Sequence, residues 1–82
     1  GHAEKQGDYE AAVRFYRQAL AMEPMRQDVW YFIHNNLGYS LHMLGRLTEA
    51  EEFCGAAVEI DPGRPNAHKN LGLVLQGQNR FI

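Results

Sequence analysis

The chain is poor in the residues that mark several common classes of protein. Its 82 residues include one cysteine, three prolines and one tryptophan. A single cysteine rules out an internal disulfide and fits a reducing compartment, so a cytoplasmic protein is expected. Eight Lys and Arg against ten Asp and Glu leave a net charge of -2, the wrong sign for gripping nucleic acid or an anionic membrane. No apolar run approaches the roughly 18–20 residues that a bilayer requires. Neither nucleic acid nor a membrane is therefore an expected partner.

Residue patterns that support catalysis or metal binding are also missing. His34 and His42 are eight residues apart, beyond the i, i+4 spacing of two helical metal ligands, and no Cys or carboxylate completes a set. No nucleophile–base pair, phosphate loop or carboxylate pair can be identified. Cys54 falls in an apolar helical face beside Glu51 and Glu52, which favours a buried thiol over a reactive one. We expect no enzyme, no metal and no cofactor.

Helical periodicity, in contrast, runs along the whole chain, and no window alternates as a strand does. Four helices are expected, at about residues 8–23, 26–44, 48–60 and 65–78. Pro24, Gly45 and Pro65 mark three of their ends. The third helix is expected to open on a capping box, in which Thr48 accepts from a free backbone N–H and Glu51 reaches back to the cap. The short connections favour antiparallel neighbours in an all-α fold.

The most informative feature is a segment that returns after 34 residues. His34-Asn35-Asn36-Leu37-Gly38-Tyr39-Ser40-Leu41 recurs as His68-Lys69-Asn70-Leu71-Gly72-Leu73-Val74-Leu75. A fixed period in this range indicates stacked repeats, in which each unit buries its apolar face against its neighbours. A second match, of residues 7–26 with residues 45–64, has an offset of 38. The four additional residues are about one helical turn, so we infer an extra turn within residues 26–30.

These residues resemble the tetratricopeptide repeat. Its pattern is an aromatic, two residues, Leu-Gly, two residues and Tyr, followed on a second helix by Ala, three residues and an aromatic, and then by Pro. The matching or substituted positions are Ala12, His34, Leu37, Gly38, Leu41, Ala50, Pro62, His68, Leu71, Gly72 and Leu75. The resemblance implies antiparallel helix pairs stacked as a right-handed superhelix.

The resemblance also predicts how these positions pack. Small residues are expected where two helices cross closely, because a larger side chain would separate them; they are Ala12, Gly38, Ala50 and Gly72. His34 and His68 are each expected to pack at their own helix crossing. Cys54, which takes the place of an aromatic residue, is expected to leave its contact loose.

The repeats divide the chain as follows. Residues 1–2 are interpreted as a tag remnant and 3–82 as one domain, made of a half repeat (3–25), a full repeat with one inserted turn (26–64) and a half repeat (65–82). Residues 3–6 are interpreted as the last turn of a missing helix that leads into Gly7, and residues 80–82 as the start of the next helix. The chain is therefore expected to be a marginally stable piece of a longer array with two open faces.

In this family the first helices of the pairs line a groove that receives a peptide. Carried over by helical spacing, the candidate groove residues are Phe32, Asn35, Asn36, Tyr39, His42, Asn66, Lys69, Asn70, Leu73 and Gln76. Asn amides can donate and accept along a peptide backbone, and Lys69 can meet a carboxylate. Asn36, Lys69 and Asn70 form only part of the carboxylate clamp that some family members carry.

The expected function is a module that binds an unidentified protein or peptide in this groove. The alternative is a scaffold whose open half-repeat faces join copies into a homo-oligomer. Trp30 lies in the inserted turn, within the most aromatic window of the chain. Its indole is interpreted either as a cover over Met22 and Met25 or as the rim of a peptide site or a subunit contact.

Overall fold

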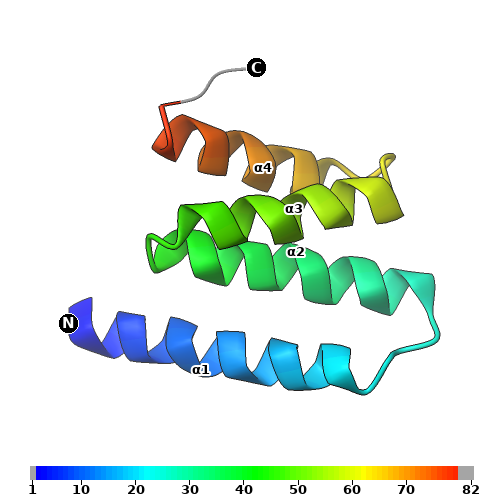
Figure 1. The fold of residues 1–82 in the computed structure, drawn as a ribbon, viewed down its shortest axis with the longest axis horizontal. Coiled ribbons are helices and arrows are strands. Elements are labelled where there is room, and N and C mark those ends of the chain that lie inside the picture. The colour runs from blue at the N-terminus through cyan, green and yellow to red at the C-terminus, as the bar shows by residue number, and fades with distance from the viewer. Residues whose placement is uncertain (1, 80–82) are drawn as a thin grey trace.

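The computed structural model describes residues 2–79, with side chains from Gly7 onward. Within these residues it contains no strand and four α-helices: α1 (His2–Ala21), α2 (Gln27–Met43), α3 (Leu47–Ile60) and α4 (Pro65–Gly77). The helices alternate in direction, each packs against the next along the chain, and α2 also touches α4 (Figure 1). The expected all-α fold of antiparallel helix pairs is confirmed.

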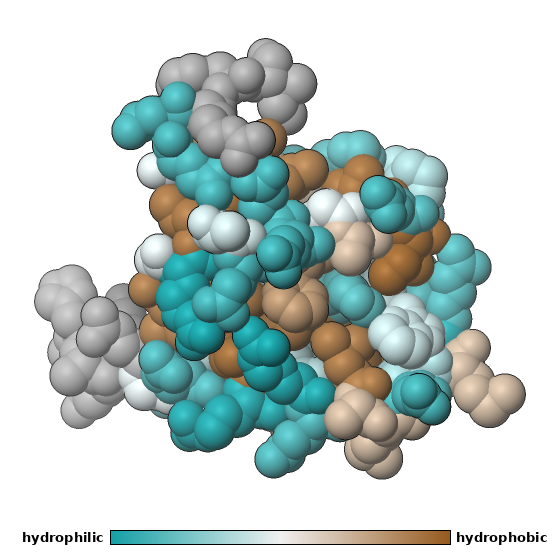
Figure 2. Space-filling model, viewed as in Figure 1, coloured by the Kyte–Doolittle hydropathy of each residue, from teal (hydrophilic) through white to brown (hydrophobic). Residues whose placement is uncertain are grey.

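The core is built around α2. Leu37 and Leu41 lie one turn apart and are 0% exposed, because α3 covers them with Ala50 and Cys54. Val13 of α1 and Val74 of α4 complete this cluster, so every helix contributes to one core. Burying a leucine side chain stabilises the fold by about 1.5–3 kcal/mol. On the face shown in Figure 2, the remaining apolar side chains form separate patches among hydrophilic ones.

The C-terminal ends of α2 and α4 follow the expected repeat. Gly45 has a φ of 78° and ends α2, and Asn79, 34 residues later, has a φ of 59° after α4. Glycine and asparagine adopt this left-handed conformation most easily. After α2, Arg46 N–H donates to Leu41 O at 2.9 Å and Gly45 N–H donates to His42 O at 3.0 Å. These two bonds satisfy carbonyls that the helix end would leave free.

Two helix starts differ from the expectation. The interpretation of residues 3–6 as the end of a separate helix is wrong, since α1 runs from His2 through Gly7 without a break. One glycine costs a helix about 1 kcal/mol, which the rest of a 20-residue helix tolerates. The start of α1 predicted at about residue 8 is therefore also too late. The suggested start at residues 80–82 lies outside the described residues.

The predicted capping box of α3 is also wrong. The helix begins at Leu47 with Arg46 as N-cap, and no side chain bonds to the cap, so Thr48 already lies inside the helix. Leu47 packs against the core, so the helix begins one residue earlier in the chain than Thr48. The Arg46 guanidinium instead pairs with the carboxylate of Glu49 at 3.1 Å.

The packing of the repeat positions differs between the two Leu-Gly motifs. A Cβ on Gly38 would collide with the Sγ of Cys54 and lie 3.0 Å from its backbone nitrogen, so α2 and α3 cross closely there. The expectation of a loose contact at Cys54 is therefore wrong. A Cβ on Gly72 would have no neighbour within 4 Å. The close crossing expected at Gly72 is also wrong, because no helix of the described chain covers that side of α4.

The two repeat histidines also differ in their surroundings. His34 is half-buried between the rings of Trp30, which it stacks on at 5.4 Å, and Phe53 at 5.9 Å. His68 is exposed, and its Nε2 bonds to the carbonyl of Pro62 at 2.9 Å. The expectation that His68 packs at a helix crossing is wrong, since its ring lies against the loop that precedes α4.

Helices α2 and α4 differ in length at their N-terminal ends. The first has 17 residues and the second 13. When His34 is aligned with His68, the four additional residues are 27–30 at the start of α2. This turn includes Trp30, and it lies at the end of the molecule where the α1–α2 and α3–α4 connections lie (Figure 1).

Candidate functional site

Seven of the ten candidate groove residues line one hollow of about 410 Å³: Asn35, Asn36, Tyr39, Asn66, Lys69, Asn70 and Leu73. The first three lie on α2 and the other four on α4. Residues three and four apart on a helix share one face, so each helix presents a polar stripe to the space between them. We call this surface the α2–α4 hollow.

A hydrogen bond joins the two helices at the base of this hollow. Asn70 Nδ2 donates to Asn35 Oδ1 at 2.8 Å, and Asn35 is 8% exposed. The bond fixes the orientation of the Asn70 amide, so its own oxygen is left as the acceptor of that group. Asn36 and Asn66 lie nearer to solvent and add amides that both donate and accept.

Among the described residues, Lys69 is the one charged side chain that lines the α2–α4 hollow. It is exposed and makes no ion pair among the described residues. Tyr39 and Leu73 add exposed apolar surface. The Tyr39 ring lies edge-on to that of Tyr9 at 6.2 Å, which links α1 to this side of α2. Desolvation raises the pKa of the Tyr9 phenol, and the neighbouring Tyr39 raises it further. The Tyr9 hydroxyl therefore remains a neutral donor.

Three of the candidate groove residues do not line the hollow. Phe32 is exposed and lies edge-on to Tyr16 of α1, with ring centroids 6.3 Å apart. His42 and Gln76 lie in the last turns of α2 and α4, beyond the residues that line it. The structure therefore brings together the middle of the two helices and leaves the ends of the predicted stripe outside.

A second hollow, of about 560 Å³, lies on the other side of α2. It is lined by Met25, Gln27, Trp30, His34, Glu59 and Ile60, and we call it the Trp30 recess. The interpretation of Trp30 as a cover over Met22 and Met25 is wrong, because these side chains are 82% and 99% exposed. Trp30 stacks on His34 instead. The α1–α2 connection turns at Glu23, with a φ of 51°, and leaves both methionines in solvent.

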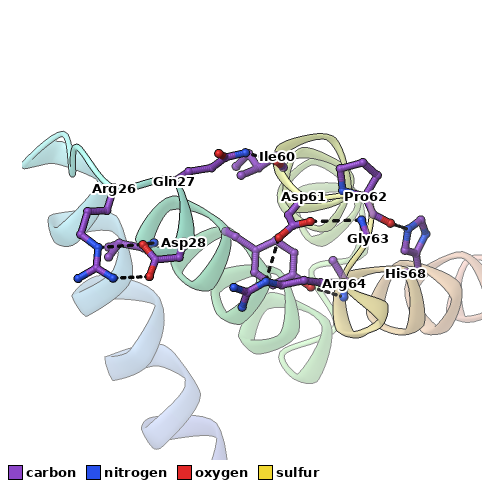
Figure 3. A network of polar contacts seen from close by, with 12 residues as sticks. Arg26, Gln27, Asp28, Ile60, Asp61, Pro62, Gly63, Arg64 and His68 are labelled. Carbon is purple, nitrogen blue, oxygen red and sulfur yellow. Dashed lines mark hydrogen bonds and ion pairs between the residues drawn. The ribbon is translucent and has the colours of Figure 1, made fainter.

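Polar contacts hold the end of the molecule that carries this recess (Figure 3). Gln27 Nε2 donates to the carbonyl oxygen of Ile60 at 2.6 Å and joins the inserted turn to the end of α3. Arg26 donates to Asp28 at 2.6 Å, and this hydrogen bond lowers the pKa of the Asp28 carboxyl. Arg64 donates to Asp61 at 2.9 Å. These contacts fix both connections relative to the helix starts.

Tyr31 caps α4 from another helix, and nothing in the sequence indicated this. Its hydroxyl accepts from the Ala67 N–H at 3.0 Å, while the Arg64 guanidinium lies over its ring at 5.1 Å. Both Tyr31 and Ala67 are buried. The first N–H groups of a helix lack partners within it, so this bond satisfies one of them. The sequence also did not identify three residues of the Trp30 recess, which are Gln27, Glu59 and Ile60. The inserted turn was the one signal that a second site could form beside it.

Other kinds of site receive no support within the described part of the chain. No group of three His, Cys, Asp or Glu side chains there could hold a metal ion, and no helix is long and apolar enough to span a membrane. Cys54 is 0% exposed, and burial raises the pKa of its thiol to about 11. The thiol therefore stays protonated at neutral pH, as expected for a buried hydrophobe.

Comparison with known proteins gives the same picture as the helix pairs. A sequence model described as tetratricopeptide repeat matches residues 2–65. Sperm-associated antigen 1 of Rattus norvegicus is 32% identical over 76 residues, and tetratricopeptide repeat protein 7B of Homo sapiens is 34% identical over 76 residues. Each alignment covers 93% of this chain, and the chain spans 8% of the length of each of these two relatives. An uncharacterised protein of Methanocaldococcus jannaschii is 38% identical over 55 residues, which are 65% of this chain and 59% of that protein.

No solved structure matches the chain significantly. The family match nevertheless covers most of the chain, and it includes both the Leu37-Gly38 motif and its packing partners Ala50 and Cys54. Helix pairs of this kind form scaffolds for protein–protein interaction. The chain belongs to the tetratricopeptide repeat family.

Proposed function

We propose that this chain is a protein–protein interaction module that binds a peptide or protein segment in the α2–α4 hollow. One observation carries the proposal: residues from two equivalent helices converge on one hollow that joins amides, an aromatic ring and a lysine with no ion-pair partner among the described residues. Sperm-associated antigen 1 and tetratricopeptide repeat protein 7B are much longer than this chain, so the proposal concerns this segment and not the activity of a whole protein.

The chemistry of the hollow favours an extended segment with one acidic group. Asn36, Asn66 and Asn70 can donate to and accept from a peptide backbone, which requires no particular side chain. Lys69 adds a positive charge with no acid beside it in the lining, so it favours a carboxylate. Tyr39 and Leu73 provide apolar contact for a neighbouring side chain.

The test is a screen of displayed 12-residue peptides, followed by NMR mapping of the selected peptide. Bound peptide should shift the amide signals of Asn36, Tyr39, Lys69 and Leu73. Lys69→Ala should weaken binding roughly tenfold, as expected for a charge-assisted contact. Arg14→Ala, at an exposed position of α1, is the matched control and should leave the affinity unchanged. Shifts confined to residues outside the hollow would contradict the proposal.

A second candidate function is self-association through the open faces of the two half repeats. This candidate assumes that residues 26–64 form one full repeat between those two halves. The space over Gly72 and the 64% exposure of Phe15 on α1 favour it. Light scattering across a hundredfold range of concentration tests it. A growing mass would support a scaffold role, whereas an unchanged monomer mass would rule it out and leave the α2–α4 hollow as the leading surface.

A further inference from the structure

The Trp30 recess lies on the opposite side of α2 from the α2–α4 hollow. Trp30 and His34 are one turn apart, whereas Phe32 and Tyr39 point away from them, as the helical period of 3.6 residues requires. The recess has its own walls, from the α1–α2 connection and the end of α3. A ligand there would not touch Lys69 or the asparagines of the hollow.

Most polar groups of the recess already have partners. The Gln27 amide donates to Ile60 O, and His34 Nδ1 donates to Trp30 O at 2.8 Å. Trp30, Met25 and Ile60 provide an apolar surface. Met25 is flexible and almost fully exposed, so it can adapt to what the recess holds.

Glu59 supplies the charge of the recess. Its side chain is exposed, and no residue of the described chain pairs with it. An exposed carboxylate beside an indole ring and an aliphatic wall is complementary to one kind of side chain. Arginine and lysine carry a long apolar stem that can lie along such a wall and a cation that can reach the acid.

The surface continues along α3 with the same charge. A shallow furrow of about 480 Å³ is lined by Thr48, Glu51, Glu52, Gly55, Ala56 and Glu59, and it shares Glu59 with the recess. Among the described residues, neither a lysine nor an arginine lines the recess or the furrow. A Cβ on Gly55 would meet nothing within 4 Å, so a bound segment can approach the backbone of α3 closely.

We propose that the Trp30 recess and the adjoining α3 furrow bind a basic segment of a partner protein. An arginine or lysine of that segment inserts its stem along Trp30 and Ile60 and places its cation at Glu59. Further basic residues follow the carboxylate of Glu52 along the furrow. This site is independent of the α2–α4 hollow, where Lys69 favours a ligand of the opposite charge.

Trp30 is the sole tryptophan, so its fluorescence reports directly on the recess. The probes are a 12-residue peptide with four arginines and four leucines, and the same peptide with each arginine replaced by glutamine. The arginine peptide should shift the Trp30 emission and bind about tenfold more tightly than its counterpart at low salt, and added salt should reduce this difference. Equal affinities, or binding that leaves the emission unchanged, would overturn the proposal.

Variants locate the contact within the recess. Glu59→Gln should lower the affinity for the arginine peptide about fivefold and leave that for the glutamine peptide unchanged, whereas Glu10→Gln on α1 should change neither. Trp30→Leu, measured by anisotropy of labelled peptide, should weaken binding about tenfold. Circular dichroism checks that each variant keeps its fold. An unchanged affinity of the Glu59 variant for the arginine peptide contradicts the proposal. A dimer that forms without peptide and that Trp30→Leu dissociates also contradicts it, since a second copy would then occupy the recess.

Discussion

Helices α2 and α4 carry the same motif in two different surroundings. Leu37 and Leu41 of α2 are fully buried, while their counterparts Leu71 and Leu75 on α4 are half-buried. The glycine of the first motif touches α3, but the equivalent Gly72 has open space around it. The motif therefore specifies a helix with an apolar stripe, and the neighbours of that helix decide how much of the stripe is buried.

The physical reason is the number of helices around each motif. Helix α2 has α1 on one side and α3 on the other, whereas α4 packs against α3 and only part of α2. Repeat proteins gain stability from contacts between neighbouring units. The same residue types should therefore stabilise the fold more at α2 than at α4. Three pairs of substitutions and one pH dependence test how the surroundings of the two helices differ.

The largest difference is expected for the second leucine of each motif. Leu41→Ala should lower the free energy of unfolding by about 2–5 kcal/mol, because it leaves a cavity in the core. Leu75→Ala should lower it by roughly 1–2 kcal/mol, since part of this side chain already contacts water. Urea unfolding followed by circular dichroism measures both. Equal losses would mean that α4 is covered as fully as α2 in solution.

The two glycines should respond with opposite signs. Gly38→Ala should destabilise the fold by about 1–3 kcal/mol, because its Cβ meets Cys54 and forces α2 and α3 apart. Gly72→Ala should stabilise it by roughly 0.5–1 kcal/mol, since alanine favours a helix and nothing opposes its Cβ. Thermal unfolding of the two variants beside the parent chain is the measurement. A destabilising Gly72→Ala would show that a partner packs on that side of α4.

The buried thiol of Cys54, which packs against Gly38, should make the stability of the fold depend on alkaline pH. Burial raises the pKa of its thiol from 9.0 to about 11. Above pH ~9 the unfolded chain loses this proton while the folded chain retains it, so the free energy of unfolding falls as pH rises. The loss between pH ~9 and ~11 should be on the order of 2 kcal/mol. Cys54→Ala, compared over the same range, should lack this part of the decline; parallel curves for the two proteins would contradict the assignment.

The smallest difference in stability is expected for substitutions at the N-terminal ends of α2 and α4. Tyr31→Phe should destabilise the fold by about 1–2 kcal/mol, because the buried Ala67 N–H loses its acceptor. At the start of α2, the Val29 N–H donates to Asp28 Oδ1 at 3.0 Å, and this contact is exposed. Asp28→Ala should therefore cost about 0.5–1 kcal/mol. Chemical denaturation of both variants decides the order, and a larger loss for Asp28→Ala would show that Tyr31 does not act as a cap.

The two candidate surfaces differ in how many of their residues could be predicted from the sequence. Helical spacing on α2 and α4 identified seven residues of the α2–α4 hollow, since both stripes follow from the same repeat. It could not identify the pair Asn35–Asn70, because their contact depends on the angle at which the two helices meet. The Trp30 recess was harder to reach, because Gln27 and Ile60 are 33 residues apart and meet only when α3 folds back.

The 34-residue period, the Leu-Gly motifs and the turn residues determined four helices, their order and the family of the chain. These are local or repeated signals, and a helix period or a glycine at positive φ needs no distant partner. Only the tertiary structure decided that Gly38 is packed and Gly72 open. It also decided that Tyr31 caps α4 and that Trp30 stacks on His34 in a recess that Glu59 also lines. Burial and contacts between helices depend on which surfaces meet in space, and the same Leu-Gly motif cannot specify different neighbours.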